Sequence, residues 1–227
     1  MTAERLSGFD SNFADIKLGL RTKFPEIQVK LYMTGLHKAD VQKQLVSATQ
    51  WVVARIGDYV FSENGQAMEE VVGTLLRQQN QTLAIAESCT GGLISDMITN
   101  VAGSSTYFLV GVTTYANQAK QEILGVSPST LATYGAVHEQ TAKEMADGVK
   151  RISGATYGLS TSGVAGPEGG TAEKPVGTVC IGLATPRGNV GRRFTFFNYS
   201  RLRNKQIFAM TALDFLRRDL LGIERPY

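Results

Sequence analysis

The sequence predicts a layered α/β domain over about residues 66–224, preceded by a small α+β unit over residues 1–62. Two patterns support this fold class. Apolar runs typical of buried strands alternate with segments whose apolar residues recur at helical spacing. Polar breaks, two of them rich in glycine, follow three of the predicted strands, as loops do in α/β sheets. With 43% hydrophobic residues in a chain of 227, the composition is sufficient for a core of this size.

The first unit carries two clear elements. Residues 27–33 alternate apolar and polar side chains, which predicts a half-buried strand. Residues 39–56 place apolar side chains at 41, 45, 48, 52, 53 and 56, which is the spacing of an amphipathic helix. Residues 1–20 show no strong pattern, and a polar turn at 62–65 ends the unit.

The second unit begins with a helix around residues 68–76, where apolar residues fall at i, i+3, i+4, i+7 and i+8. Strands and helices then alternate along the chain. The predicted strands are 82–86, 107–115, 157–161, 176–185 and 190–197. Four helices are predicted among these strands. One starts after Gly92, one begins at Asn117, one spans residues 141–152, and the last includes residues 208–220.

The composition excludes several classes of function. A net charge of +3 with dispersed basic residues does not predict nucleic-acid binding. The two cysteines are far apart, which indicates neither a disulfide framework nor a metal site. The sequence shows no signal peptide and no apolar run of membrane length, so we expect a soluble, cytoplasmic protein without membrane partners.

The most informative stretch is residues 83–92, where an apolar run ends at Glu-Ser-Cys-Thr and two glycines precede a predicted helix. The N–H groups at such a helix end attract an anion or a developing oxyanion. Ser88 and Cys89 are both potential nucleophiles there. The alternative is that Ser88 or Thr90 merely caps the helix.

A second polar break, at residues 115–120, supplies a candidate base. Neither of the two histidines has a metal-like partner nearby, and a Ser-His-Asp triad is not indicated. A serine nucleophile would then need a lysine, and the pair we infer is Ser88 with Lys120. The alternative, which the residues alone favour, is that Lys120 is a solvated surface lysine on a short helix. Cys89 is the rival nucleophile, because a helix N-terminus lowers a thiol pKa, or it is a small buried hydrophobe.

The third break, residues 162–170, is rich in glycine and is followed by Gly177. Such a loop is typical of phosphate-binding segments, but ordinary surface loops have the same composition.

Several collinear motifs together resemble the CinA C-terminal domain family over about residues 66–220. They are Ala86–Gly92, Gly103–Ser105, Tyr115-x-Asn117-x-x-Lys120, Gly135–Val137, Gly163-x-Ala165-Gly166-Pro167-x-Gly169-Gly170 and Lys174–Val179. The segment before them is similar to the small KH-like linker that precedes the amidase in full-length CinA proteins. On this resemblance the chain lacks their large molybdopterin-binding-like N-terminal domain.

The resemblance implies a three-layer α/β/α amidase domain that hydrolyses nicotinamide mononucleotide to nicotinate mononucleotide and ammonia. Ser88 is then the nucleophile, Lys120 its base, and Tyr115 an aid to proton transfer. The implied substrate-binding residues are Thr90, Gly91, Gly92, Asn117, Ser162, Gly163, Gly166 and Arg201, the last for the phosphate. The partner is a small-molecule nucleotide, no metal or cofactor is required, and a homodimer is expected.

Two departures from the family pattern bear on the site. His138 stands where the family usually has serine, and the arginine-rich pattern after Arg201 is degraded, so that Lys205 replaces a second arginine. The alternative function is a catalytically weak nucleotide-binding or interaction module of the same family.

Overall fold

The structure, a computed structural model, describes residues 2–223. It divides into two compact units, one up to Gly65 and the other from Gln66. The predicted domain end at residue 224 lies outside the described residues. Among those residues, no helix is both long enough and apolar enough to cross a membrane.

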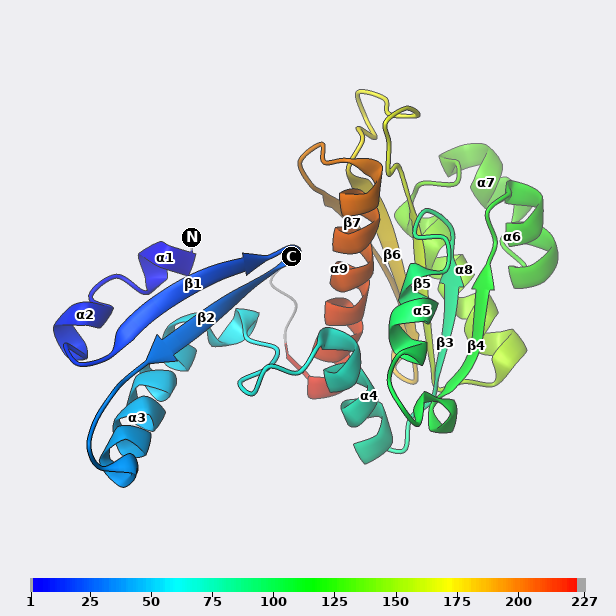
Figure 1. The fold of residues 1–227 in the computed structure, drawn as a ribbon. Coiled ribbons are helices and arrows are strands. Elements are labelled where there is room, and N and C mark those ends of the chain that lie inside the picture. The colour runs from blue at the N-terminus through cyan, green and yellow to red at the C-terminus, as the bar shows by residue number, and fades with distance from the viewer. Residues whose placement is uncertain (1, 224–227) are drawn as a thin grey trace. The chain divides into compact units, whose positions relative to one another are not determined.

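The first unit is a two-stranded antiparallel sheet with helices (Figure 1). Its elements are α1 (Thr2–Arg5), α2 (Phe9–Asn12), β1 (Lys17–Lys23), β2 (Glu26–Tyr32) and α3 (Lys38–Ile56). A small core joins residues of α2, α3 and the strands, including Phe9, Ile16, Val52 and Ile56. The sequence did not reveal β1, because Leu18 and Leu20 are its only large apolar residues.

The second unit confirms the predicted α/β class. Its five-stranded sheet has the order β4-β3-β5-β6-β7. The strands are β3 (Leu83–Glu87), β4 (Phe108–Thr113), β5 (Tyr157–Gly163), β6 (Thr178–Thr185) and β7 (Gly188–Thr195). Strand β3 runs parallel to β4 and β5, whereas β6 and β7 are antiparallel to their neighbours. The carboxyl ends of β3, β4 and β5 therefore meet at one end of the sheet.

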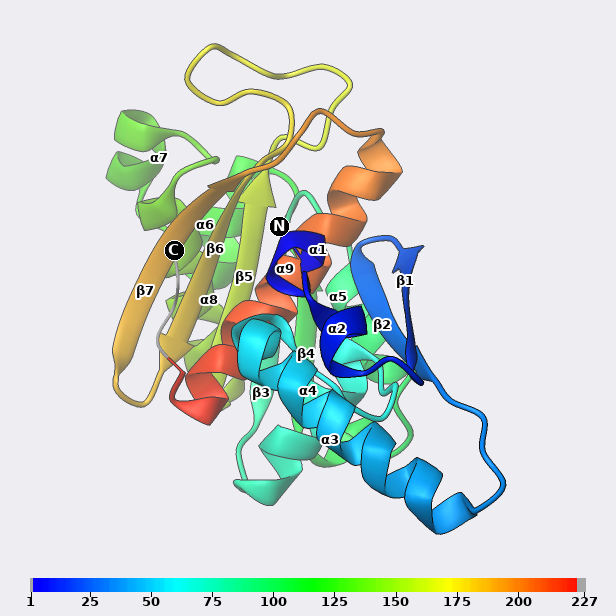
Figure 2. The same ribbon diagram turned by 90° about the vertical axis from the view of Figure 1, so that its left-hand side faces the viewer.

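Helices cover both faces of this sheet (Figures 1 and 2). One face carries α5 (Leu93–Thr99) and α9 (Arg201–Leu221), with α4 (Met68–Gln78) packed on both. The other face carries α8 (Glu139–Ser153), against which α6 (Asn117–Leu124) and α7 (Pro128–Tyr134) pack. Helix α9 begins at Arg201 and so includes the predicted residues 208–220, whereas α7 was not predicted.

Helix α8 packs unusually close to the sheet. Gly158, Gly182 and Gly191 lie on neighbouring strands beneath it. A Cβ at these positions would collide with backbone carbonyl oxygens of α8, those of Ala146, Ala142 and Glu139. This close packing brings the residues that precede α8 to the carboxyl end of β5.

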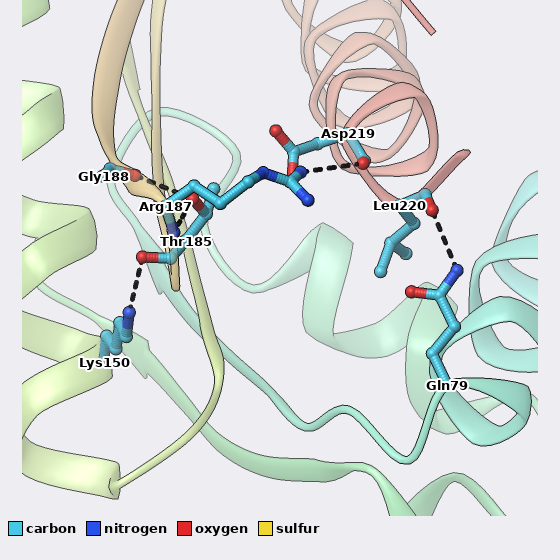
Figure 3. Close-up of polar contacts among 7 residues, drawn as sticks. All are labelled: Gln79, Lys150, Thr185, Arg187, Gly188, Asp219 and Leu220. Carbon is cyan, nitrogen blue, oxygen red and sulfur yellow. Dashed lines mark hydrogen bonds and ion pairs between the residues drawn. The ribbon is translucent and has the colours of Figure 1, made fainter. Parts of the chain in front are cut away.

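The opposite end of the sheet is held by a set of polar contacts (Figure 3). Arg187, in the turn between β6 and β7, donates to the Asp219 carboxylate of α9 over 2.7 Å. Lys150 of α8 donates to the Thr185 carbonyl over 2.8 Å, and Gln79 donates to the Leu220 carbonyl over 2.8 Å. The first two contacts join α9 and α8, from the two faces, to the end of β6 and the turn after it, and the third joins the end of α4 to α9.

Candidate active site

Ser88 follows β3 directly and is 8% exposed. Its N–H donates to the Thr161 carbonyl over 3.0 Å, so the neighbouring strand β5 fixes its backbone. Lys120 Nζ lies 3.1 Å from Ser88 Oγ. The structure therefore brings together the two residues that sequence reasoning paired.

Lys120 is fully buried in the first turns of α6. Its Nζ also donates to the carbonyl oxygens of Thr114, over 2.8 Å, and Tyr115, over 3.1 Å. Burial lowers the pKa of Lys120 below its ordinary value of 10.5, and the nearby Cys89 offsets part of this effect. The structure thus excludes the alternative of a solvated surface lysine.

The hydrogen bonds of Lys120 determine where its lone pair points once it is neutral. Two carbonyl oxygens can only accept, so a neutral amine gives them its two N–H groups. The remaining tetrahedral position faces Ser88 Oγ. The lone pair is therefore directed at the Ser88 hydroxyl proton, as a general base requires.

The helix end after Ser88 differs from the prediction. Glu87 is fully buried, and its carboxylate accepts hydrogen bonds from the N–H groups of Gly92, Ile94 and Ser95 and from Ser95 Oγ. The N–H of Gly91 donates to the Ser88 carbonyl. The anion site expected at the start of α5 is thus occupied by a carboxylate of the protein itself.

Cys89 is buried beside Ser88. Burial raises the pKa of its thiol to about 12, and the charge of Glu87 adds to the increase. A thiol in this state is protonated at neutral pH, which disfavours it as a nucleophile. Burial outweighs the predicted lowering by the helix end, and the Glu87 carboxylate at that helix end raises the thiol pKa further.

A pocket of about 200 Å³ opens at the carboxyl ends of the parallel strands. Its lining residues are Ser88, Cys89, Tyr115, Lys120, Ala136, Val137, Ser162, Gly163, Ala165 and Arg201. No acidic side chain is among them, so the pocket suits an anionic or neutral ligand. A Cβ at Gly163 would lie 2.5 Å from the Thr178 carbonyl oxygen, which explains why glycine is needed there.

The remaining predicted binding residues lie outside this lining. Thr90 is buried and its Oγ1 lies 2.7 Å from Thr161 Oγ1, and Asn117 is exposed at the first position of α6. Gly91 and Gly92 contribute to the turn that Glu87 caps. The Gly166 carbonyl accepts a hydrogen bond from Arg201 over 2.7 Å, so Gly166 positions a lining residue.

Residues 136 and 137 line the pocket but were not among the predicted site residues. Ser162 Oγ donates to the Ala136 carbonyl over 2.7 Å, which ties this loop to β5. His138 is not in the lining. Its Nδ1 accepts from the Gln140 N–H over 3.0 Å, so it caps α8, and its ring stacks on Tyr134 at 4.3 Å.

Two cations of α9 lie at this end of the domain, one helical turn apart. Arg201 lines the pocket, whereas Lys205 is half-buried. A Cβ placed on Gly91 would be 3.5 Å from Lys205 Nζ, so this ammonium lies over the turn that follows Ser88. The two side chains supply positive charge where the family pattern is degraded.

Comparison with known proteins places this arrangement in a family. The model of the CinA C-terminal domain matches residues 65–220. A CinA-like protein of Desulfosudis oleivorans is 52% identical over 96% of the chain and 53% of its own length. A putative competence-damage inducible protein of Thermoanaerobacter pseudethanolicus is 49% identical over 74% of the chain and 41% of its own length. The chain spans about half the length of these curated relatives.

Solved structures agree with the assignment. The competence/damage inducible protein CihA of Agrobacterium tumefaciens is 39% identical, with a TM-score of 0.64, over 66% of this chain and 91% of its own. A CinA superfamily protein of Enterobacter cloacae is 32% identical, with a TM-score of 0.64, over 71% and 96% of the two chains. On sequence and structure together, the chain belongs to the CinA C-terminal domain family.

Proposed function

We propose that the protein is a nicotinamide-nucleotide amidase, which hydrolyses nicotinamide mononucleotide to nicotinate mononucleotide and ammonia. The observation that carries the proposal is the contact of 3.1 Å between Ser88 Oγ and the Nζ of a fully buried Lys120. A serine and a desolvated lysine at hydrogen-bonding distance are the parts of an acyl-transfer site that needs no histidine. Membership of the CinA family supports the substrate.

The reaction proceeds in two halves. In the first, neutral Lys120 takes the Ser88 proton while Oγ attacks the carboxamide carbon. The resulting ammonium returns the proton to the leaving nitrogen, and ammonia departs from an acyl-serine ester. In the second, Lys120 deprotonates a water that attacks the ester, and the ammonium gives this proton to Ser88 Oγ as the bond between Oγ and the acyl carbon breaks. The acid product then loses its own proton to solvent.

The oxyanion needs donors other than the start of α5, because Glu87 occupies those N–H groups. In α/β-hydrolases the N–H of the residue after the nucleophile serves this purpose. Cys89 holds that position and lines the pocket. We therefore assign the Cys89 backbone N–H to the oxyanion, with no role for its thiol.

The test is ammonia release from nicotinamide mononucleotide by the wild type, Ser88→Ala, Cys89→Ala and the surface control Ser129→Ala. We expect Ser88→Ala to lose activity by about 10⁴-fold or more, with Ser129→Ala unaffected. Loss in Cys89→Ala with survival in Ser88→Ala would instead identify a cysteine hydrolase. No release by the wild type would exclude the amidase and favour a nucleotide-binding module.

A further inference from the structure

Glu87 is a fully buried carboxylate next to the nucleophile, and the proposed mechanism does not use it. Its side chain is not in the pocket lining. The two carboxylate oxygens accept four hydrogen bonds of 2.8–3.1 Å, from the N–H groups of Gly92, Ile94 and Ser95 and from Ser95 Oγ. Among residues 2–223 no cation forms an ion pair with it. This buried carboxylate therefore depends on the four donors of the segment that follows β3.

The Glu87 side chain spans the turn between β3 and α5. On one side of the turn its backbone is held in the sheet, where it pairs with Thr113 of β4 and Thr161 of β5. On the other side its carboxylate holds the first turn of α5. Gly91 and Gly92, with φ of 62° and 93°, provide the left-handed backbone that brings the chain back to the carboxylate. The nucleophile therefore lies in a short turn that is fixed at both ends.

The same contacts decide which N–H groups of the turn remain for a ligand. Glu87 accepts from three N–H groups at the start of α5. The Gly91 N–H donates to the Ser88 carbonyl over 3.1 Å, and the Ser88 N–H donates to the Thr161 carbonyl. In the part of the chain that the structure describes, no other residue accepts from the Cys89 N–H. The donor assigned above to the oxyanion thus remains available.

We propose that Glu87 is a positioning residue for the reaction. Its carboxylate fixes the turn so that Ser88 Oγ stays in contact with Lys120 and the Cys89 N–H stays available to the oxyanion. The inference rests on the proposed function and extends it to a group outside the pocket lining. Most of that lining comes from elements other than this turn. Loss of the carboxylate should therefore slow the chemical step more than it weakens binding of the ligand.

Glu144 offers a matched control in the same unit, because its carboxylate also caps the start of a helix. It accepts from the Ser127 N–H over 2.9 Å and from Thr130 Oγ1 over 2.7 Å, at the start of α7. Glu144 is not in the pocket lining. Glu144→Gln thus weakens a cap of the same kind without altering the turn after β3. A loss of stability is expected in both variants, whereas a loss of reactivity is expected only in Glu87→Gln.

The test measures the reactivity of Ser88 in the full chain with phenylmethanesulfonyl fluoride. In this reaction Ser88 Oγ forms a bond to sulfur as the S–F bond breaks, fluoride leaves, and Lys120 takes the hydroxyl proton. Mass spectrometry follows the labelling, with Ser88→Ala as the blank. The rate reports the position of the nucleophile, and the final extent reports the folded fraction. Ammonia release from nicotinamide mononucleotide gives kcat and KM of the same variants.

We expect Glu87→Gln to slow labelling of Ser88 about 10–100-fold while the final extent stays that of the wild type. Its kcat should fall by a similar factor, with KM within about twofold. Glu144→Gln should keep the wild-type labelling rate and kcat. This separation of rate from extent is one that a merely structural role of Glu87 would not produce.

A wild-type labelling rate in Glu87→Gln would overturn the inference. So would equal slowing in Glu144→Gln, since reactivity would then follow stability alone, and so would a fall in the extent of labelling without a change in its rate. Failure of the amidase is a separate outcome. A wild type that is labelled at Ser88 but releases no ammonia removes the proposed substrate, and the labelling rates still decide the role of Glu87.

Discussion

The two ends of the sheet in the CinA-type unit surround their cationic side chains differently. At the far end, Arg187 pairs with the Asp219 carboxylate, and Lys150 reaches a carbonyl (Figure 3). At the site end, Lys120 is fully buried, and among the described residues no carboxylate lies in ion-pair contact with it. A cation with a carboxylate partner stays charged and holds structure. A fully buried lysine without a carboxylate partner loses its proton more readily, because burial disfavours the charged form, and it can then act as a base.

The largest effect should come from removing the unpaired cation. Lys120→Met keeps the length of the side chain but has no lone pair for Ser88, so amidase activity should fall by about 10³-fold. Stability should rise by about 1 kcal/mol or more, because a buried ammonium is replaced by an apolar group. Ammonia release tests the expected loss of activity, and urea unfolding of the same preparation tests the expected gain in stability. A variant that is both inactive and less stable would show that Lys120 is a structural residue.

The next effect concerns the carboxylate that is fully buried at the site end. Glu87→Gln retains the shape of the side chain. Its amide NH₂ group, however, is a donor and would face backbone N–H groups at the start of α5, which are also donors. We expect a loss of about 2 kcal/mol in the free energy of unfolding. Chemical denaturation measures it, with the exposed Glu122→Gln as the control. A loss below about 0.5 kcal/mol would mean that the cap contributes little.

The pH dependence of stability follows from the lowered pKa of Lys120. Unfolded, this lysine holds its proton to near 10.5, whereas the folded protein releases it at lower pH. Between the two values the unfolded state binds more protons, so wild-type stability gains with rising pH. The stability advantage of Lys120→Met should therefore be largest at neutral pH and shrink toward pH 10.5. Thermal unfolding of the wild type and of Lys120→Met across this pH range tests the expected direction. A stability difference between the two proteins that did not change with pH would contradict it.

The smallest effect is expected at the far end. Arg187 is largely exposed, so its pair with Asp219 is screened by water. Arg187→Ala should reduce stability by only about 0.5–1 kcal/mol and leave amidase activity as it was. The midpoint of unfolding measures the change in stability, and ammonia release measures the activity of the variant. A marked loss of activity would show that the two ends of the sheet are coupled.

Sequence reasoning found the Ser88–Lys120 pair because polar breaks after neighbouring strands meet in space and no histidine offered a base. It did not find that Glu87 caps the start of α5, since a sequence motif does not show toward which groups a carboxylate side chain points. Burial, with a smaller contribution from that carboxylate, reversed the expected effect on the pKa of Cys89. Ala136 and Val137 carry no chemical signature, so their place in the pocket came from the packing of α8 alone.

The fold was predictable where the pattern is long and apolar. The strands β3, β5 and β6 and the helices α3, α4 and α8 follow from periodicity. The first two turns of α9 are mostly polar, so the apolar pattern marked this helix only from Phe208 onward. For α7 a signal was present, because Ser127 followed by Pro128 is typical of a helix start.

The glycines beneath α8 have a consequence for redesign of the pocket. Enlarging Gly158, Gly182 or Gly191 would lift the helix and carry residues 136 and 137 away from Ser162, so this wall has almost no freedom to vary. Another part of the lining is the loop that contains Ala165, where Arg201 donates to the Gly166 carbonyl. Variants intended to accept bulkier amides should therefore alter that loop and leave the glycines unchanged.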